Sequence, residues 1–277
     1  MSVKKYIKRV FRYLIKGVPN VNVTANIGQN INGSILKGKK IIITGGGRGL
    51  GYNMAKRCIM EGAEVLIAGR NEESLVHVVE ELGNNCKYIV FDISDIHGIE
   101  EFVKTAKEKL DGLTSIICNA GISLHEKNIL DVSVKNFEQQ IQTNLESNYF
   151  LAKEFISQHN RESEADIIFI SSERGHQCDD IPYGLTKVAI NSLTKGLARR
   201  FYKENIRVNA IAPGVTASDM TGRRADGNIF AEEQVAGRFF LPEEIAEIAI
   251  FLLSSASKCI SGEIITCDAG QYISSYF

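Results

Sequence analysis

The sequence lacks the cysteine and histidine spacings that hold metal ions in proteins. Its six cysteines include no CxxC pair, and no two of its five histidines stand four residues apart. We therefore expect no metal site. Because closely spaced cysteines are missing, we expect all six to be buried, reduced thiols of a cytoplasmic protein.

Long apolar runs are also missing, since none approaches the roughly 20 residues that a membrane-spanning helix needs. The first 60 residues contain no Asp or Glu. Within them, residues 3–16 carry six positive charges, and the apolar positions 7, 10, 11 and 14 share one helical face. This basic amphipathic helix could lie on an anionic membrane surface, pack on the protein or a partner subunit, or act as a transit peptide.

A large excess of either charge is absent, because 32 basic residues balance 33 acidic ones. That balance excludes the broad basic field typical of nucleic-acid binding and favours a small-molecule partner. With 277 residues and 44% hydrophobic content, the chain can bury a sizeable core.

From residue 39 onward, short apolar runs alternate with helix-length segments. The expected strands are 41–44, 64–68, 88–92, 115–119, 166–170, 206–212 and 263–267. The expected helices start near 51 and at 72, and then cover 95–110, 134–159, 183–202 and 242–254. This alternation predicts a single Rossmann-type, doubly wound α/β domain over 39–277, with about seven parallel strands and helices on both faces. Residues 1–38 would form the basic helix and an extended arm.

A glycine-rich turn follows the first expected strand. The sequence TGGGRGLG spans residues 44–51 and has GxxxGxG spacing. Glycines placed between a strand and a helix permit a tight turn and a close approach of the backbone to a pyrophosphate. The free amides at the start of the helix would then face the phosphates.

Further motifs follow downstream in a recognisable order. CNAG spans 118–121, ISSERG spans 170–175, YGLTK spans 183–187, and PGVTASDMT spans 213–221. Together with the glycine turn, these motifs resemble the short-chain dehydrogenase/reductase family, and most of all its 3-oxoacyl-(acyl-carrier-protein) reductase branch. The resemblance extends over nearly all of 39–277. It implies an oxidoreductase that forms a homo-oligomer, either a tetramer or a dimer.

Four residues are candidates for catalysis. Tyr183 and Lys187 stand four apart at the start of an expected helix, so both side chains can reach one site. A nearby cation stabilises a phenolate and thereby makes tyrosine a usable acid or base. By family resemblance, Tyr183 exchanges a proton with the substrate oxygen and Ser172 hydrogen-bonds the same oxygen. The resemblance also implies that Lys187 holds the nicotinamide ribose and that Asn144 holds a water for proton relay.

The resemblance implies a nicotinamide dinucleotide as cofactor. Its expected contacts are Gly45, Gly47, Arg48, Gly49, Leu50, Gly51, Arg70, Asp92, Ile93, Asn119, Ala120, Gly121, Tyr183, Lys187, Pro213, Gly214, Val215 and Ser218. An NAD site usually has an acidic residue after the second strand, about 20 residues past the glycines. Here Gly69 and Arg70 occupy that place. We expect Arg48 and Arg70 to pair with a 2′-phosphate, which favours NADP(H) over NAD(H).

The substrate is less clearly indicated than the cofactor. The loop before Tyr183 carries five ionisable side chains, namely Glu173, Arg174, His176, Asp179 and Asp180. They fit a polar sugar or polyol-like ketone, whereas the family branch suggests a 3-oxoacyl thioester, and a solvated loop is a third interpretation. The expected function is interconversion of a carbonyl and a secondary alcohol. The alternative is a non-catalytic nucleotide-sensing or scaffold protein of the same fold, bound to a membrane or a partner through its basic N-terminus.

Overall fold

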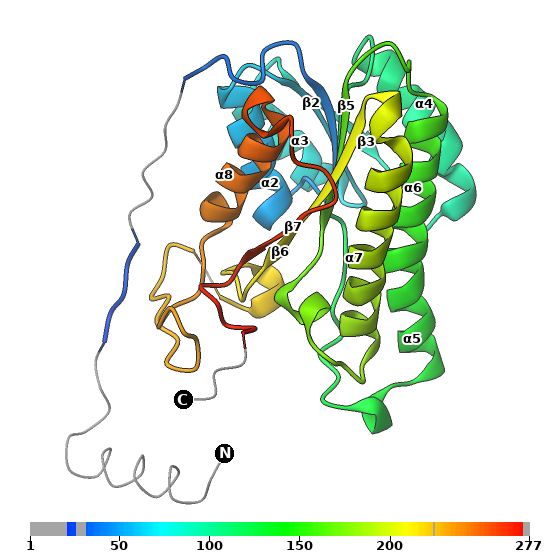
Figure 1. The fold of residues 1–277 in the computed structure, drawn as a ribbon. Helices are drawn as coiled ribbons and strands as arrows, with labels where there is room; N and C mark the ends of the chain where they lie inside the picture. The colour runs from blue at the N-terminus through cyan, green and yellow to red at the C-terminus, as the bar shows by residue number, and fades with distance from the viewer. Residues whose placement is uncertain (1–20, 26–31, 224, 274–277) are drawn as a thin grey trace, which may run out of the picture.

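The computed structural model describes residues 21–25, 32–223 and 225–273 (Figure 1). The amphipathic helix predicted for residues 3–16 lies outside the described residues. Among those described, no helix combines the length and the apolar character that crossing a bilayer requires.

The core of the molecule is one parallel sheet. Its strands are β1 (Lys40–Thr44), β2 (Glu64–Gly69), β3 (Cys86–Val90), β4 (Ser115–Cys118), β5 (Ala165–Ile170), β6 (Ile206–Pro213) and β7 (Ile264–Cys267). They lie in the order β3-β2-β1-β4-β5-β6-β7 and all neighbours are parallel. The seven-stranded sheet predicted from the apolar runs is confirmed. Only the edge strands differ from expectation: β3 and β7 are largely half-buried, because each pairs with a single neighbour.

Helices cover both faces of the sheet, as Figure 1 shows. One face carries α2 (Gly49–Met60), α3 (Glu72–Leu82) and α8 (Pro242–Leu253), whose apolar residues form one core with β1 and β2. The other face carries α4 (Ile99–Lys109), α6 (Ser147–Ser157) and α7 (Pro182–Phe201), which form a second core. The doubly wound Rossmann-type fold is therefore confirmed.

The long helix expected over 134–159 is not uniform. It consists of α5 (Val134–Ile141), a π-helical segment η3 (Gln142–Glu146) and α6. A π-helical segment adds a residue to the turn, and such segments are frequent at functional sites. Asn144 lies in the middle of η3 and is fully buried.

The cysteines only partly follow the expectation of burial. Cys58, Cys86 and Cys118 are buried free thiols, whereas Cys178 and Cys259 are exposed. Both exposed cysteines lie outside the strands and α-helices, beyond the periodic apolar pattern that indicates the core. The prediction that every thiol is buried was therefore wrong.

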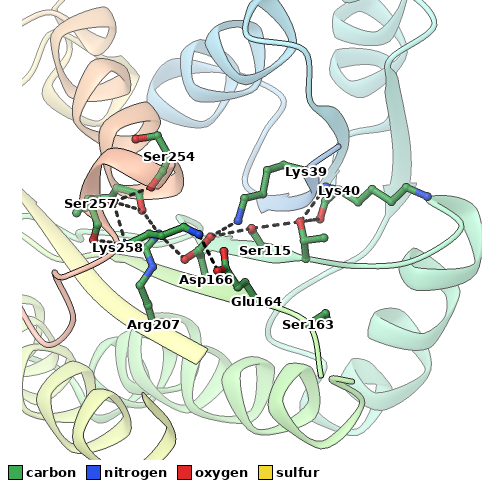
Figure 2. A network of polar contacts seen from close by, with 12 residues as sticks. Lys39, Lys40, Ser115, Ser163, Glu164, Asp166, Arg207, Ser254, Ser257 and Lys258 are labelled. Carbon is green, nitrogen blue, oxygen red and sulfur yellow. Dashed lines mark hydrogen bonds and ion pairs between the residues drawn. The ribbon is translucent and has the colours of Figure 1, made fainter. Parts of the chain in front are cut away.

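A buried ion network lies at the end of the sheet where β5 and β6 begin (Figure 2). The Asp166 carboxylate, which is 3% exposed, lies 2.6 Å from Lys39 Nζ and 2.7 Å from Arg207 Nη2. Arg207 also donates to the main-chain oxygens of Ser257 and Leu252. Since the charge of Asp166 is matched by two cations, we assign this end of the sheet a structural role.

Candidate active site

The glycine turn leaves no room for a side chain at Gly51. Gly45 has a φ of +67°. A Cβ atom on Gly51 would lie 2.2 Å from the Gly45 carbonyl oxygen. The side-chain Nδ2 of Asn119 donates to the Thr44 carbonyl at 2.9 Å and so connects the end of β4 to the turn. The predicted cofactor residues Gly45 to Gly51 and Asn119 to Gly121 therefore lie together at the carboxyl edge of the sheet, where such folds bind ligands.

The two arginines expected to bind a 2′-phosphate of the cofactor lie at this same edge. Arg48 is exposed and directly precedes α2. Arg70 follows β2, and its Nη1 lies 3.9 Å from Asp92 Oδ2, with both side chains largely exposed. An exposed ion pair contributes little free energy, so the contact with Asp92 leaves Arg70 able to bind a phosphate.

Ser172, Tyr183 and Lys187 come together beside this turn. Ser172 follows β5, while Tyr183 and Lys187 lie in the first two turns of α7. The Lys187 Nζ atom lies 5.4 Å from the centre of the Tyr183 ring and donates to the Ile170 carbonyl at 2.9 Å. Lys187 and Ser172 are buried, whereas Tyr183 is half-buried.

The pKa of Tyr183 is raised above its ordinary value. A neighbouring cation would instead lower it. Desolvation of the phenol is the largest cause, while a hydrogen bond with Ser172 acts in the opposite direction. Desolvation also lowers the pKa of Lys187 to about 8. A phenol with a raised pKa keeps its proton at neutral pH, so Tyr183 can serve as a proton donor.

Asn144 is held by two hydrogen bonds to the main chain of Ile122. Its Oδ1 accepts from the Ile122 amide and its Nδ2 donates to the Ile122 carbonyl, both at 2.8 Å. A Cβ atom on Gly121 would lie 3.3 Å from Asn144 Oδ1 and 3.7 Å from Lys187 Nζ. Asn144 thus fixes the main chain that follows the CNAG segment, close to Lys187. Its expected role of holding a water for proton relay stays a prediction.

Sequence reasoning missed several supporting residues. Asn148 Nδ2 donates to the Asn144 carbonyl at 2.7 Å. The Ser171 hydroxyl donates to Asn191 Oδ1 at 2.6 Å, and Asn191 Nδ2 donates to the Gly175 carbonyl at 3.0 Å. A signal was present, because Asn191 lies four residues after Lys187 and so shares its helical face.

The loop between Ser172 and Tyr183 uses most of its charge internally. Arg174 Nε and Nη2 contact the two Asp179 carboxylate oxygens at 2.5 and 2.7 Å, and the Asp179 side chain is 2% exposed. Asp180 accepts from the Ile129 amide, and the His176 ring stacks on Tyr272 with 4.7 Å between centroids. These contacts weaken the inference that the loop charge faces a polar substrate.

Glu173 is the exception in this loop. Its Oε2 atom is buried and has no hydrogen-bond partner within the described part of the chain. Desolvation, with the nearby Asp268 carboxylate, raises the pKa of Glu173 to about 6. The charge of Glu173 also contributes, after desolvation, to the raised pKa of Tyr183.

Residues 213–218 continue from β6 and are here called the nicotinamide loop, after the contact that the family resemblance predicts for them. Ala217 N donates to the Phe240 carbonyl at 2.8 Å, and Phe240 N donates to the Val215 carbonyl at 3.0 Å. These two hydrogen bonds bring together the two ends of residues 219–239, which are here called the substrate loop. The junction of the two ends is here called the neck. The predicted cofactor residues Pro213 to Ser218 form one side of that neck.

No three or more His, Cys, Asp or Glu side chains cluster as a metal site within the described residues. The described site combines a glycine turn, of the kind that can bind a dinucleotide, with a buried lysine beside a tyrosine and a serine.

Comparisons with known proteins point in the same direction. A family model described as enoyl-(acyl carrier protein) reductase matches residues 45–271. The chain is 32% identical over 243 residues to a 3-oxoacyl-(acyl-carrier-protein) reductase of Chlamydia pneumoniae, which covers 85% of this chain and 97% of the relative. It is 29% identical over 248 residues to gluconate 5-dehydrogenase of Gluconobacter oxydans, covering 86% and 96%.

A solved structure is similar over the same region. The 3-ketoacyl-(acyl-carrier-protein) reductase of Brucella melitensis, complexed with NADH, matches with a TM-score of 0.80 at 28% identity and covers 86% of this chain and 100% of that one. The family model, the extent of the sequence similarity and the fold agree. The chain belongs to the short-chain dehydrogenase/reductase family of oxidoreductases.

Proposed function

We propose that this protein is an NADP(H)-dependent oxidoreductase that interconverts a carbonyl and a secondary alcohol. The observation that supports this best is the convergence of Ser172, Tyr183 and buried Lys187 beside the glycine turn. The turn fits a dinucleotide, because Gly51 approaches Gly45 so closely that only a bare backbone can occupy the place. When bound, the nicotinamide ring supplies or accepts the hydride.

Each residue of the site has a distinct part in this proposal. In reduction, Tyr183 starts protonated, donates its proton to the carbonyl oxygen and is left as a phenolate. Oxidation is the reverse and starts from that phenolate, which takes the proton from the alcohol. Ser172 hydrogen-bonds the same oxygen and orients it. Lys187 provides a positive charge beside the phenol and a donor for the cofactor ribose. Asn144 holds the main chain that follows the CNAG segment, close to Lys187.

NADP(H) is the proposed cofactor because two arginines and no carboxylate occupy positions 48, 69 and 70. An arginine binds a 2′-phosphate through paired, charge-assisted hydrogen bonds. The exposed contact of Arg70 with Asp92 is easily exchanged for such a bond.

Two substrate classes fit the proposal. The similarity to 3-oxoacyl-(acyl-carrier-protein) reductases favours a 3-oxoacyl thioester. The similarity to gluconate 5-dehydrogenase, with the half-buried Glu173 directly after Ser172, favours a polar sugar or polyol-like ketone. A panel of both classes, assayed by NADPH oxidation, separates them.

Replacing the proposed proton donor tests the function. Tyr183→Phe removes the donated proton, and we expect kcat to fall about 10²- to 10⁴-fold while NADPH still binds. The measurement is NADPH oxidation with the preferred substrate, together with NADPH titration. Wild-type-like turnover by the variant would contradict the proposal. Binding of NADPH without turnover by the wild type would favour the nucleotide-sensing or scaffold alternative.

We further propose that the protein forms a homo-oligomer. Apolar side chains remain exposed on neighbouring helices, with Tyr149 51%, Leu185 44% and Val188 42% exposed. A monomer mass in light scattering would contradict this.

The sequence pattern of residues 3–16 supports a further proposal, peripheral contact with anionic membranes. Flotation of the full chain with anionic and with neutral vesicles tests it.

A further inference from the structure

The segment Val21–Ala25, here called the arm, lies against the substrate loop, some two hundred residues away in the chain. Asn228 joins the two. Its Oδ1 accepts from Val23 N at 3.1 Å, and its Nδ2 donates to the Val21 carbonyl at 2.9 Å. The amide side chain thus pairs with the arm as a neighbouring strand would, satisfying one donor and one acceptor of its main chain.

The arm also has two different faces. Val23 and Ala25 are half-buried, whereas Asn22 and Thr24 are exposed, which is the alternation of an extended segment with one covered side. The covered side packs on a small apolar cluster formed by Ala217, Ile229, Ala231, Phe239 and Leu241. This cluster is separate from the two cores that flank the sheet.

The cluster connects the arm to the proposed cofactor site. Ala217 and the partly buried Val215 belong to the nicotinamide loop, while Ile229 and Phe239 belong to the substrate loop. The neck of the substrate loop is held without any contribution from the arm, because Arg238 contacts both carboxylate oxygens of Glu244 at 2.7 Å. Asn228 lies near the middle of the loop, and there it binds the arm.

We propose that the arm is a strap that positions the substrate loop and the nicotinamide loop, with Asn228 as its positioning residue. Apolar contact sets how the strap lies, and the two hydrogen bonds of Asn228 set its register. Cofactor affinity and the KM for substrate then depend on a segment that precedes the Rossmann domain. This inference rests on the proposed function for its cofactor readout only, since the contact itself can be tested without nucleotide.

The test uses full-length variants with a matched control. Val23→Asp/Ala25→Asp places two charges on the covered face of the arm, and Asn22→Asp/Thr24→Asp places the same two charges on its exposed face. Asn228→Ala removes the paired hydrogen bonds without changing an arm residue, but it also removes the bond that Asn228 Oδ1 accepts from Phe230 N at 3.1 Å within the loop. Val23→Asp/Ala25→Asp leaves the Phe230 bond in place and is therefore the deciding variant. Circular dichroism and thermal melting of each variant confirm that the domain is folded.

Two measurements are made on each variant. The first is the Kd for NADPH, which we expect to rise about three- to tenfold in Val23→Asp/Ala25→Asp and in Asn228→Ala, as for the loss of one to two net hydrogen bonds. The second is trypsin cleavage after Arg223, an exposed residue of the substrate loop, identified by mass spectrometry. We expect faster cleavage in the same two variants and wild-type behaviour in Asn22→Asp/Thr24→Asp.

The outcomes separate this inference from the proposed function. Wild-type Kd and cleavage in Val23→Asp/Ala25→Asp and Asn228→Ala would overturn the strap, as would an equal effect of the exposed-face control. If the wild type itself does not bind NADPH, the proposed function fails, and cleavage after Arg223 still decides whether the arm holds the loop.

Discussion

The proposed cofactor side and the proposed substrate side of the site are built in different ways. On the cofactor side, the turn of residues 44–51 is fixed by backbone geometry between adjacent elements, as the approach of Gly51 to Gly45 shows. On the substrate side, side chains from distant segments hold one another, as Asn228 holds Val23. A local motif can therefore reveal the first side, whereas the second depends on contacts that only the folded chain assembles.

The largest effect is expected from filling the glycine turn. Gly51→Ala would place a Cβ atom 2.2 Å from the Gly45 carbonyl oxygen, so the turn must deform. We expect loss of NADPH binding and a decrease in the free energy of unfolding of about 3 kcal/mol or more. Chemical denaturation and nucleotide titration measure the two effects.

Gly47→Ala is the matched control, because the nearest atom to its Cβ would be Ser74 Cβ at 3.4 Å, an ordinary contact. We expect a change in unfolding free energy within about 0.5 kcal/mol. Equal damage from both substitutions would contradict the claim that close backbone approach at Gly51 shapes this side.

A second substitution disturbs the loop between Ser172 and Tyr183, which also belongs to the proposed substrate side. A Cβ atom on Gly184 would lie 1.8 Å from Asp179 Oδ2. Gly184→Ala therefore displaces Asp179 from Arg174 and shifts the loop that carries Ser172. We expect kcat/KM to fall about tenfold, or roughly 1.4 kcal/mol. The measurement is steady-state kinetics with the preferred substrate.

A double-mutant cycle identifies the cause of that loss. An added Cβ on Gly184 would also lie 2.5 Å from Asp179 Cβ, so the background must lack that atom as well. In an Asp179→Gly background the collision is absent, and alanine is favourable in a helix, so adding Gly184→Ala should cost little further activity. The same tenfold loss in both backgrounds would show that Asp179 is not the obstacle.

The smallest expected effect concerns the pH dependence of stability. The pKa of Glu173 is raised from 4.5 to about 6 in the folded protein. The protonated carboxyl therefore favours folding below pH 4.5, and this contribution is lost as the pH rises through about 6. Glu173→Gln replaces the carboxyl with an amide that does not titrate, so the variant does not lose this contribution as the pH rises. The free energy of unfolding of the variant, relative to that of the wild type, should therefore increase by about 1 kcal/mol between pH 4.5 and 7.5, after allowance for solvent screening.

Denaturant titration at both pH values measures this difference, and Glu138→Gln, on the exposed face of α5, controls for the removal of one negative charge. A pH-independent difference between wild type and Glu173→Gln would show that Glu173 is not desolvated.

The sheet, the glycine turn and the motif residues were predictable because each depends on a short stretch of sequence. Unbroken apolar runs indicate buried parallel strands, and the spacing of Tyr183 and Lys187 is set by one helical turn. The pairing of Arg174 with Asp179 was not foreseen, although both residues were noted, because charge in a loop does not indicate its partner. The π-helical segment that contains Asn144 was also missed, because the sequence pattern over residues 134–159 predicts one continuous helix.

The electrostatics of the site were predicted least well. Sequence spacing placed Lys187 beside Tyr183, and from this a lowered tyrosine pKa was expected. Burial dominates instead and raises the pKa of Tyr183 while lowering that of Lys187 to about 8. The degree of burial depends on the whole fold and cannot be inferred from two residues four positions apart.

The most direct test of the central claim is a titration of the purified protein with NADPH and with NADH, followed by nicotinamide fluorescence, in wild type and in Arg48→Ala/Arg70→Ala. We predict that the wild type binds NADPH at least about tenfold more tightly, roughly 1.4 kcal/mol, and that the double variant loses this preference. Equal affinity for the two nucleotides in the wild type would contradict the assignment of NADP(H), and failure to bind either would contradict the proposed function.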